Sequence, residues 1–493
     1  MADGEMAGTG IAGLDQIMNG GLAKGHLYLI DGEPGSGKTT VALSFILEGA
    51  RRGETGLYIT LSETEAELRL SARSHGWEIG PLVTVRELVP PEALLAAGPA
   101  QSLLYPSDFE LGETTRMIFE LFEEIRPQRV VLDSLSEIRL LAQNSLRYRR
   151  QIMAMKQYFA RSDATVLLLD DLVTERGDRT VHSLVHGVVN LAQITPEYGP
   201  ERRRARVLKY RGNAYAGGYH DMRIRTGAVE VYPRLVAQHH TRDFDREATS
   251  SGIPEFDRLL AGGIERGSST LVLGPSGAGK TLVGLQFLLA AIGRGERAAM
   301  LSFDEEFGLL VRRLLLLGID LEAEMKRGLL RIDHLDTAEI TPGEFAQLVR
   351  RRVADWGAQA VLIDSLNGYQ ASMPDEAAQL AHMHELLQYL NRQGVTTFLT
   401  IAQHGLVGDM KSPVDITYLA DTVILLRYFE AMGRMRRALS VIKKRMGGHE
   451  HTIREYRITE AGLVLGEPLE EFQGVLRGVP VFVGQDLTRL MGG

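Results

Sequence analysis

Two short glycine-rich segments carry the residues whose types and spacing point most directly to chemistry. The pattern G-x-x-x-x-G-K-[ST] occurs as GEPGSGKT at residues 32–39 and as GPSGAGKT at residues 274–281. Each copy follows an apolar run and opens a helical pattern, which is the context of a phosphate-binding loop. Glycines let backbone N–H groups turn inward around phosphate oxygens, and the following helix directs its positive end at the same anion. We therefore expect two nucleotide sites rather than two glycine-rich turns that match by chance.

The lysine and the hydroxyl residue of each loop have separate expected roles. Lys38 and Lys280 should reach the β- and γ-phosphates, whereas Thr39 and Thr281 should ligate Mg²⁺. The residues that we expect to contact nucleotide in these loops are Gly35, Ser36, Gly37, Lys38, Thr39, Thr40, Gly277, Ala278, Gly279, Lys280, Thr281 and Leu282.

An Asp-Ser pair ends an apolar run downstream of each loop. The first run is RVVLDS, with Asp133, and the second is AVLIDS, with Asp364. An acid at the carboxyl end of a neighbouring parallel strand lies beside the phosphate loop and can orient the Mg²⁺ shell. Asp and Ser also favour helix N-caps, and the two interpretations are compatible.

A cluster with acidic residues follows the first predicted helix and the next strand in each half of the chain. It reads Leu61-Ser62-Glu63 in the first half and Phe303-Asp304-Glu305-Glu306 in the second. A carboxylate at this place would face the γ-phosphate and polarise an attacking water. The alternative is a solvated charge at the end of a strand.

Alternating strands and helices must position these residues. Short apolar runs at 26–31, 56–61, 129–133 and 165–170 predict strands buried on both faces, and runs at 269–273, 298–303, 360–363 and 396–401 repeat them. Helical patterns such as 39–52 and 114–125 lie between the strands. This alternation predicts α/β domains with right-handed crossovers.

A duplication accounts for the length of 493 residues. Residues 9–63 and 251–305 align without a gap at an offset of 242 (Lys280 minus Lys38), which also matches Asp15 with Asp257. The repeat spans about half of the chain, so it predicts two domains rather than a solenoid of short repeats. We expect the domains at 1–240 and 241–493, joined through the polar stretch QHHTRDFDREAT at 238–249.

Composition excludes several classes of protein. Hydrophobic residues make up 44% and charged residues 24%, which is ordinary for a globular protein. The absence of cysteine excludes disulfides, cysteine-ligated zinc and a thiol nucleophile. The net charge of −8 argues against a protein that coats nucleic acid, and no apolar run is long enough to span a membrane. The N-terminus does not read as a signal peptide, so we expect a soluble, cytoplasmic protein.

The tandem loops, the preceding L-D-x-x-x-x-G-G-x-x-x-G pattern and the Asp-Ser strands together resemble the KaiC family of circadian-clock ATPases. The resemblance covers about residues 9–483 and includes VLKYRGNAYAGGYH in the first half and DTVILLRYFEAMGRMRRALSVIKKRMGGHEHTIREY in the second. It implies tandem RecA-like P-loop NTPase domains, each a mostly parallel sheet flanked by helices. It also implies a homo-hexamer of two stacked rings with ATP and Mg²⁺ at the subunit interfaces, with further stacking into a dodecamer left open.

The resemblance also assigns catalytic acids, because the family carries two adjacent glutamates at the acidic clusters. The first half has Ser62 and Glu63, so Glu63 is the expected base of the first ring. The second half has Asp304 and Glu305, both acidic, although the first is one methylene shorter than glutamate.

Basic residues of a neighbouring subunit contact the phosphates in this family. The matching residues are Lys209 and Arg211 in the first half and Lys443, Lys444 and Arg445 in the second, unless they are ordinary cations of an edge strand. Further positions that the family places at the nucleotide are Tyr210, Asn213, Tyr215, which replaces a histidine, and Ser74.

Family members phosphorylate themselves on a Ser-Thr pair in the second ring. That pair is Thr417-Tyr418 here, and a third family position corresponds to Ser412. Thr417 is the best candidate acceptor of this serine/threonine autokinase activity, unless it is simply a β-branched strand residue.

The resemblance finally suggests partners and rivals. The chain stops at VPVFVGQDLTRLMGG, short of the family tail that binds KaiA, so we expect no KaiA binding, whereas a KaiB-like protein could bind the first ring. The leading hypothesis is a hexameric ATPase that serves as a clock or signalling timer. The alternatives are a RecA- or RadA-like DNA-dependent recombination ATPase and a nucleotide-gated scaffold with little turnover.

Overall fold

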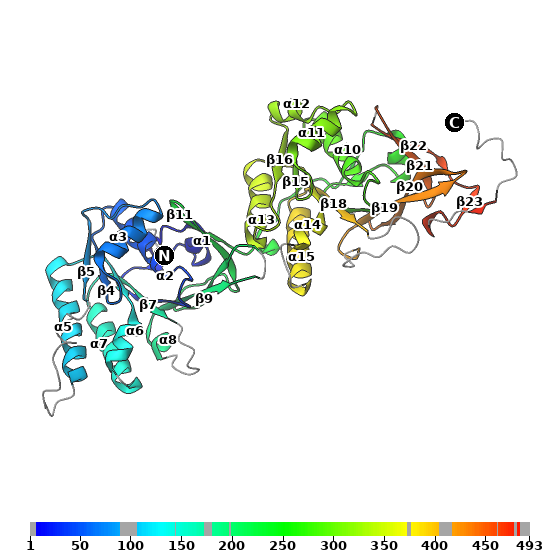
Figure 1. Cartoon of the computed structure of the whole chain (residues 1–493). Helices are drawn as coiled ribbons and strands as arrows, with labels where there is room; N and C mark the ends of the chain where they lie inside the picture. The colour runs from blue at the N-terminus through cyan, green and yellow to red at the C-terminus, as the bar shows by residue number, and fades with distance from the viewer. Residues whose placement is uncertain are drawn as a thin grey trace. The chain divides into compact units, whose positions relative to one another are not determined.

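The chain folds into two compact units, Met1–Arg234 and Leu235–Gly493 (Figure 1). The computed structural model describes residues 6–88, 106–142, 144–171, 180–196, 199–371, 376–403, 417–460, 462–477 and 481–483. Within these ranges no helix is long and apolar enough to cross a lipid bilayer.

The first unit alternates strands and helices until its last three long strands. Its strands are β1 (Met6–Ala7), β2 (Leu22–Ala23), β3 (Leu27–Gly32), β4 (Gly56–Thr60), β5 (Val83–Glu87), β6 (Arg129–Asp133), β7 (Thr165–Asp171), β8 (Gly187–Ile194), β9 (Arg202–Tyr210), β10 (His220–Arg225) and β11 (Ala228–Tyr232). Its helices are α1 (Ala12–Ile17), α2 (Lys38–Arg51), α3 (Glu65–Ser74), α5 (Pro106–Ile125), α6 (Leu135–Ala142), α7 (Ser145–Phe159) and α8 (Thr180–Leu184).

A nine-stranded sheet in the order β11-β10-β9-β8-β3-β7-β6-β4-β5 organises this unit. The strands from β8 to β5 in this order are parallel, and β9, β10 and β11 continue the sheet as antiparallel neighbours. Parallel neighbours need crossover connections, which explains the helices between them. Because β3 lies between β7 and β8, the chain leaves β3 in the middle of the parallel part.

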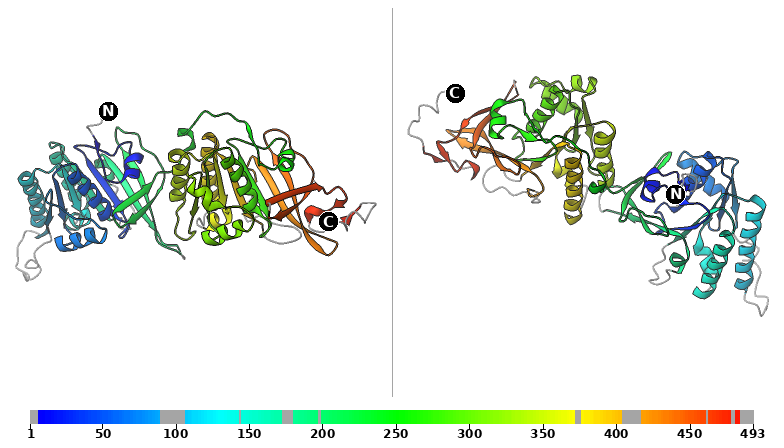
Figure 2. Two further views of the ribbon diagram at one scale, coloured as in Figure 1. Left: turned by 90° about the horizontal axis from the view of Figure 1, so that it is seen from above. Right: turned by 180° about the vertical axis from the view of Figure 1, so that it is seen from behind.

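Alternate residues of β3 face opposite sides of the sheet. Tyr28 and Ile30 pack in one hydrophobic cluster with residues of α1, α2 and α3, whereas Leu27 and Leu29 pack in another with residues of α5, α6, α7 and α8. All residues of β3 are buried. Helices therefore cover both faces of the sheet, as the views in Figure 2 show.

The second unit repeats this order of elements. Its strands are β12 (Ala248–Thr249), β13 (Ile264–Glu265), β14 (Ser269–Gly274), β15 (Ala298–Ser302), β16 (Leu330–His334), β17 (Ala360–Asp364), β18 (Thr396–Ala402), β19 (Thr422–Ala431), β20 (Arg434–Lys444), β21 (Arg454–Thr459), β22 (Gly462–Pro468), β23 (Phe472–Gln473) and β24 (Val481–Phe482). Its helices are α9 (Pro254–Leu259), α10 (Lys280–Gly293), α11 (Phe307–Leu315), α12 (Leu321–Lys326), α13 (Pro342–Arg350), α14 (Leu366–Ala371) and α15 (Glu376–Arg392).

The second sheet has the same topology as the first. Its order is β16-β15-β17-β18-β14-β19-β20-β21-β22, parallel from β16 to β19 and antiparallel beyond. One face packs against α9, α10, α11 and α12, and the other against α13, α14 and α15. The structure thus confirms the predicted fold class, two mostly parallel sheets that are each flanked by helices.

The predicted elements lie close to the observed ones. The strand predicted at 129–133 is β6 (Arg129–Asp133), and the helix predicted at 39–52 is α2 (Lys38–Arg51). The helix predicted at 114–125 is longer, because α5 already begins at Pro106. Its first turns lack the clear apolar period on which the prediction depended.

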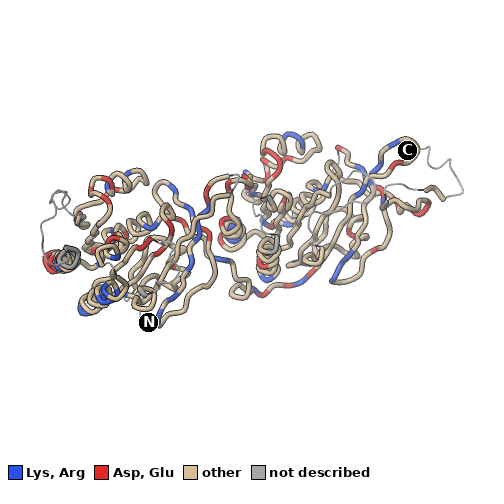
Figure 3. Tube along the Cα trace, turned by 60° about the horizontal axis from the view of Figure 1, so that its bottom comes forward, with Lys and Arg blue, Asp and Glu red and all other residues tan. Residues whose placement is uncertain are grey.

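Acidic and basic residues are interspersed along the described trace of both units (Figure 3). The whole sequence carries 55 basic and 63 acidic residues. The positive charge that phosphate binding requires therefore has to come from individual side chains at defined places.

Candidate nucleotide sites

The phosphate loop of the first unit connects the buried end of β3 to the first turn of α2. Gly35 and Gly37 have φ angles of +82° and +101°, in the left-handed region that favours glycine. A Cβ at Gly37 would also lie only 2.8 Å from Cδ1 of Ile224. Gly37 is the N-cap of α2 and no side chain caps that helix end. The first N–H groups of a 14-residue helix are thus left for an anion.

Lys38 extends back over the loop that it follows. Its ammonium donates to the carbonyl oxygens of Gly32 at 2.9 Å and Glu33 at 3.0 Å. It also forms an ion pair with Oδ1 of Asp171, on β7, at 2.8 Å. The side chain of Lys38 is 9% exposed, so the charge is held inside the loop rather than in solvent.

Thr39 and Asp133 meet beside this loop. The Thr39 hydroxyl donates to Oδ2 of Asp133 at 3.1 Å, and the hydroxyl of Tyr58 donates to the same oxygen at 2.7 Å. Burial raises the pKa of Asp133, although both hydrogen bonds and the charge of Lys38 act against that shift. A cation next to Asp133 would relieve this cost, which fits a Mg²⁺ site made of one hydroxyl and one carboxylate.

Glu63 lies just after the end of β4. Its backbone is fixed by Thr60, whose hydroxyl donates to the Glu63 carbonyl at 2.8 Å and accepts from the Glu63 N–H at 3.0 Å. Burial raises the pKa of Glu63, and the negative charges of Asp133 and Glu67 raise it further. Glu63 is therefore close enough to the Thr39–Asp133 pair to sense its charge, as a base in the same site must be.

The second loop has the same backbone. Gly277 and Gly279 have φ angles of +76° and +95°, and a Cβ at Gly279 would lie 2.8 Å from Cδ1 of Ile458. The ammonium of Lys280 donates to the carbonyl of Pro275 at 2.9 Å. Burial lowers the pKa of Lys280, and the charges of Asp364 and Asp304 oppose that shift.

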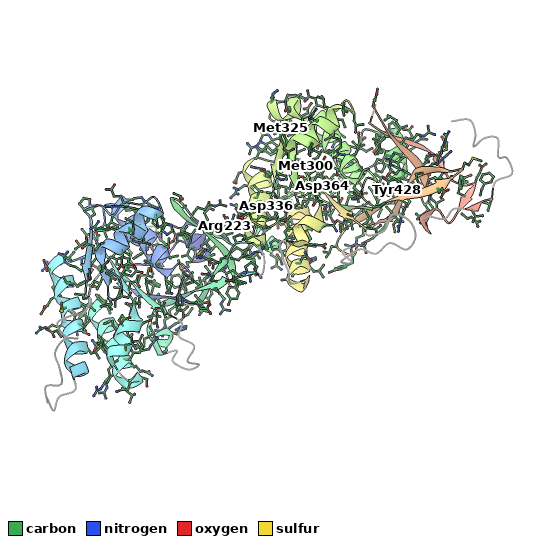
Figure 4. All side chains as sticks on the ribbon, viewed as in Figure 1. Arg223, Met300, Met325, Asp336, Asp364 and Tyr428 are labelled. Carbon is green, nitrogen blue, oxygen red and sulfur yellow. The ribbon has the colours of Figure 1, made fainter. Side chains whose placement is uncertain are left out.

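The hydroxyl–carboxylate pair also recurs in the second unit. The Thr281 hydroxyl donates to Oδ2 of Asp364 at 2.8 Å, and the hydroxyl of Thr400 donates to Oδ1 of the same residue. Burial raises the pKa of Asp364. Figure 4 labels Asp364 together with Tyr428, whose hydroxyl lies 3.1 Å from the place of a Cβ on Gly277 in the loop.

The two acids of the second cluster point to different partners. Asp304 accepts a hydrogen bond from the hydroxyl of Ser365 and contributes to the field at Lys280. Glu305 instead accepts two hydrogen bonds from Arg313, at 3.0 and 2.6 Å. The structure therefore brings Asp304 toward the loop and ties Glu305 to α11.

The basic residues Lys209, near the end of β9, and Arg211, directly after it, lie at the other end of the parallel strands of the first sheet. Lys209 donates to the carbonyls of His182 at 2.5 Å and Val185 at 2.8 Å, and Arg211 donates to that of Ser183 at 2.7 Å. Burial lowers the pKa of Lys209, and the charge of Arg211 adds to this effect. Both cations thus gather at the segment that leads into β8.

The register of the strands places Arg211 and the phosphate loop at opposite edges of the sheet. Tyr210 pairs with Gly187, and Gly187 pairs with Tyr28 at the start of β3, whereas the loop leaves β3 at its last residue. A cavity of about 610 Å³ lies at the starting edge. The residues that line it include Arg211, Asn213 and the first or preceding residues of three strands, His26, Arg129 and Thr165.

The second unit repeats this arrangement around the predicted phosphoacceptors. Lys443 donates to the carbonyls of Thr417 at 3.1 Å and Ala420 at 2.8 Å, and Arg445 donates to that of Tyr418 at 2.5 Å. The backbone of Arg445 reaches Asp421, which in turn bonds to Ser269 at the start of β14. The predicted cations and the Thr417-Tyr418 pair are therefore neighbours at the edge opposite the loop.

The comparisons with known proteins agree with this geometry. A sequence profile described as "ATPase: KaiC" matches residues 7–236 and again residues 249–470. The chain belongs to the KaiC family. It is 27% identical over 494 residues to "Circadian clock protein KaiC3" of Synechocystis sp., covering 98% of this chain and 96% of that protein. It is 28% identical over 484 residues to "Circadian clock oscillator protein KaiC" of Thermostichus vulcanus, covering 97% and 92%.

Membership of the KaiC family gives the coarse function of the two loops. The chain is a KaiC-family ATPase, and binding of ATP follows from that activity. Both of its RecA-like P-loop domains fall inside the matched residues, so the resemblance inferred from the sequence motifs is confirmed.

Several predicted contact residues of this KaiC-family chain have other structural partners. The middle residue of each basic motif points inward, because side chains alternate along a strand. Tyr210 donates to the carbonyl of Gly21 at 2.9 Å, and Lys444 donates to that of Leu260 at 2.6 Å and pairs with Glu265 at 3.0 Å.

The remaining predicted residues are spread more widely. Ser74 ends α3 and donates to the carbonyl of Ser71, Asn213 donates to that of Met18, and Tyr215 donates to that of Leu208. Besides Lys38, the predicted contact residues Ser36, Thr40, Ala278 and Leu282 are also buried. Ser412 lies outside the described residues.

Sequence reasoning did not find Tyr58, Thr400 or Asp171. Tyr58 and Thr400 lie inside mostly apolar strands, and only the sheet order shows that they face the aspartates. Asp171 had a usable signal, because the run VLLLDD ends in two acids in the same way that RVVLDS ends in Asp133.

Proposed function

We propose that this KaiC-family ATPase hydrolyses Mg-ATP at sites that two neighbouring subunits of a homo-hexamer build together. The observation that carries the proposal is the separation of Lys38 and Arg211 within one unit. They lie at opposite edges of one sheet, separated by the six residues of β3. That strand is roughly 16 Å long at 3.3 Å per residue, so one domain cannot bring both cations to the same phosphate.

A second copy resolves this separation. If the edge that carries Arg211 in one subunit faces the phosphate loop of the next, each nucleotide receives a lysine from one chain and an arginine from the other. An arginine supplied across an interface stabilises charge on the transferring phosphoryl group. In the second unit, Lys280 and Arg445 likewise lie at opposite ends of the parallel strands. This supports the same arrangement of neighbouring subunits in both rings.

The pairs Thr39–Asp133 and Thr281–Asp364 are the residues that would hold Mg²⁺ in the two sites. Each pair combines a hydroxyl with a buried carboxylate whose pKa is raised, a donor set that a hard divalent cation suits. When bound, Mg²⁺ neutralises charge on the β- and γ-phosphates.

Glu63 would orient and deprotonate the attacking water in the first ring. Its carboxyl senses the charge of Asp133, which supports a place near the reacting phosphate. In the second ring Asp304 is better placed than Glu305 for this role, because Arg313 occupies both oxygens of Glu305.

The second ring would also phosphorylate itself, with Thr417 as the acceptor. The Thr417 carbonyl accepts from Lys443 at 3.1 Å, so the residue lies beside a cation that would contact the neighbouring subunit's γ-phosphate. Tyr418 is 54% exposed and next in the chain, but its phenol extends farther from the backbone than a threonine hydroxyl. Ser412 is the third candidate.

A timing or signalling role would follow if slow ATP hydrolysis changed the conformation of the ring and a partner protein detected that change. The relatives named above are described as circadian clock proteins, and a KaiB-like protein at the first ring is the partner that we propose. Stacking into a dodecamer would be a further step of the same assembly.

Mixing two inactive variants tests the shared sites. In full-length chains that also carry Lys280→Ala, Lys38→Ala removes the loop cation of the first unit and Arg211→Ala removes the edge cation. Each variant alone should lose phosphate release. Equimolar mixed subunits should regain a fraction of it, because some interfaces then combine an intact loop with an intact arginine.

The controls separate assembly from catalysis. Sizing by light scattering with and without ATP should show hexamers of each variant and of the mixture. Arg116→Ala, which changes an arginine on α5 whose side chain is 67% exposed, should leave activity unchanged. Hexamers that fail to regain activity on mixing would refute sites shared between subunits.

A further inference from the structure

The ammonium of Lys38 has all three of its donors engaged. It lies 2.9 Å from the Gly32 carbonyl, 3.0 Å from the Glu33 carbonyl and 2.8 Å from Oδ1 of Asp171. A lysine ammonium has three N–H donors and no acceptor. A phosphate oxygen that binds Lys38 must therefore replace or share one of these partners. Asp171 is the charged one, and it repels phosphate.

Asp171 does not reach Lys38 by chance rotation of a surface side chain. Its backbone is paired in register with Gly32, at the point where the loop leaves β3. Its N–H donates to the hydroxyl of Ser136 at 3.3 Å, and that hydroxyl lies 3.3 Å from Oδ2. The same hydroxyl lies 3.2 Å from Oδ1 of Asp170, so Ser136 is shared between the two carboxylates, while Oδ1 of Asp171 faces Lys38.

The second unit carries a different pair at the same two places. Gly274 pairs in register with Ala402, so Ala402 takes the position of Asp171. Three residues after Asp364, as Ser136 is after Asp133, stands Asn367, whose side chain bonds to the backbone N–H and carbonyl of Ala402 at 2.7 and 3.3 Å. Among the described residues no carboxylate forms an ion pair with Lys280. The Ser136–Asp171 combination is thus exchanged as a set for Asn367–Ala402.

We propose that Asp171 is a competitor built into the first nucleotide site, which exchanges with nucleotide phosphates for Lys38 and so weakens binding and speeds release of ADP in that unit. The proposal rests on the proposed role of Lys38 as a phosphate ligand. When nucleotide phosphates bind Lys38, the ion pair between Lys38 and Asp171 is lost, which costs binding free energy. When the product leaves, Asp171 pairs with Lys38 again. The second unit lacks this competitor in the described part of its site and should hold nucleotide more tightly.

Equilibrium binding of a fluorescent ADP analogue to the full-length chain tests this. Lys280→Ala in every variant confines specific binding to the first unit, and the Lys38→Ala/Lys280→Ala chain sets the background. Asp171→Asn keeps the shape of the side chain and removes its charge. We expect Asp171→Asn to bind ADP about tenfold more tightly, a difference of about 1.4 kcal/mol, mainly through slower release in stopped-flow measurements.

A matched charge change elsewhere serves as control. Glu120→Gln removes an exposed carboxylate on α5 and should leave ADP affinity unchanged. Equal or weaker binding by Asp171→Asn would overturn the proposal. Weaker binding only when Mg²⁺ is present would overturn it too, by making Asp171 part of the metal site. No binding above background in the Lys280→Ala chain would instead refute the proposed role of Lys38.

A reciprocal exchange keeps the proposal testable if Asp171→Asn does not fold. In a chain with Lys38→Ala, the double substitution Asn367→Ser with Ala402→Asp transfers the competitor to the second unit. We expect ADP binding there to weaken by about tenfold relative to Lys38→Ala alone. Unchanged affinity in a folded double variant would overturn the proposal independently.

Discussion

Arg313 binds both carboxylate oxygens of Glu305, with Nε to Oε1 at 3.0 Å and Nη2 to Oε2 at 2.6 Å. Forked pairs of this kind fix the plane of a carboxylate as well as its charge. The repeat offset of 242 places Ser71 at the corresponding position of the first unit (313 minus 242), so Glu63 has no arginine there. The two units therefore treat their matching glutamates differently.

Releasing Glu305 should speed hydrolysis in the second unit, because a freed Glu305 carboxylate can act on the attacking water alongside Asp304. Arg313→Gln leaves Glu305 without its forked partner, and an exposed ion pair is worth about 1 kcal/mol or less, so hydrolysis should rise by no more than about fivefold. Phosphate release by the full chain with Lys38→Ala measures this. Arg312→Gln, on the same helix, is the matched control. A fall in rate would show that Arg313 positions Glu305 for catalysis.

Glu63→Gln should remove hydrolysis in the first ring and leave nucleotide binding intact. A positioned general base contributes about 10²- to 10⁴-fold, and an amide cannot take up the proton. The rate is measured in the Lys280→Ala chain, alongside binding of a fluorescent nucleotide. An unchanged rate would show that another group activates the water.

The acid limb of first-ring hydrolysis should move when Glu67 is neutralised. The charge of Glu67 raises the pKa of Glu63, and a carboxylate base works only when deprotonated. Glu67→Gln should lower that pKa, so activity should persist to more acidic pH. Glutamine retains the capping box with Thr64, which keeps α3 intact. Identical pH–rate profiles would contradict Glu63 as the titrating base.

Asp133→Asn should stabilise the chain while it removes metal-dependent function. Burial raises the folded-state pKa of Asp133 above its unfolded value, so the charged form destabilises the fold above the folded pKa. The gain in Tm should be present at neutral pH and shrink as the pH falls toward the ordinary aspartate range. Thermal unfolding without nucleotide measures it. Added Mg-ATP should protect the first unit of the parent chain but not of Asp133→Asn, and a lower Tm in the variant would contradict this account.

Phosphosite mass spectrometry after incubation with ATP should find phosphate on Thr417. Thr417→Ala should abolish this phosphorylation. Tyr418→Phe should retain it, because phenylalanine keeps the aromatic ring at this exposed position and removes only the phenol hydroxyl. Lys280→Ala controls for phosphate transferred by another protein. Phosphate on none of Ser412, Thr417 and Tyr418 would end the autokinase proposal.

The loops, the Asp-Ser strands and the fold were predictable because each depends on local pattern. Lys38 and Thr39 lie at fixed spacings within the loop motif, and Asp133 lies at the end of an apolar run. Both features can be identified in the sequence without knowing the order of strands in the sheet. Strand periodicity explains the success of the α/β prediction as well, since the buried strands read as short apolar runs.

The partners of these residues were not predictable, because they come from strands far away in sequence. Tyr58 reaches Asp133 only because β4 lies beside β6, and Asp171 reaches Lys38 only because β7 lies beside β3. Arg313 and Glu305 are eight positions apart, beyond the i, i+4 spacing that sequence rules use. The inward turn of Tyr210 and Lys444 likewise needs the strand register.

The opposite placement of Lys38 and Arg211 has a consequence for counting sites. In any row of subunits joined in this way, one end carries an unmatched loop and the other an unmatched arginine, so the row has one complete site fewer than it has chains. A row that bends back on itself loses neither end. Whether the row closes into a ring would then decide whether every chain has a complete site. A single missing subunit would leave a loop at one end and an arginine at the other that cannot meet.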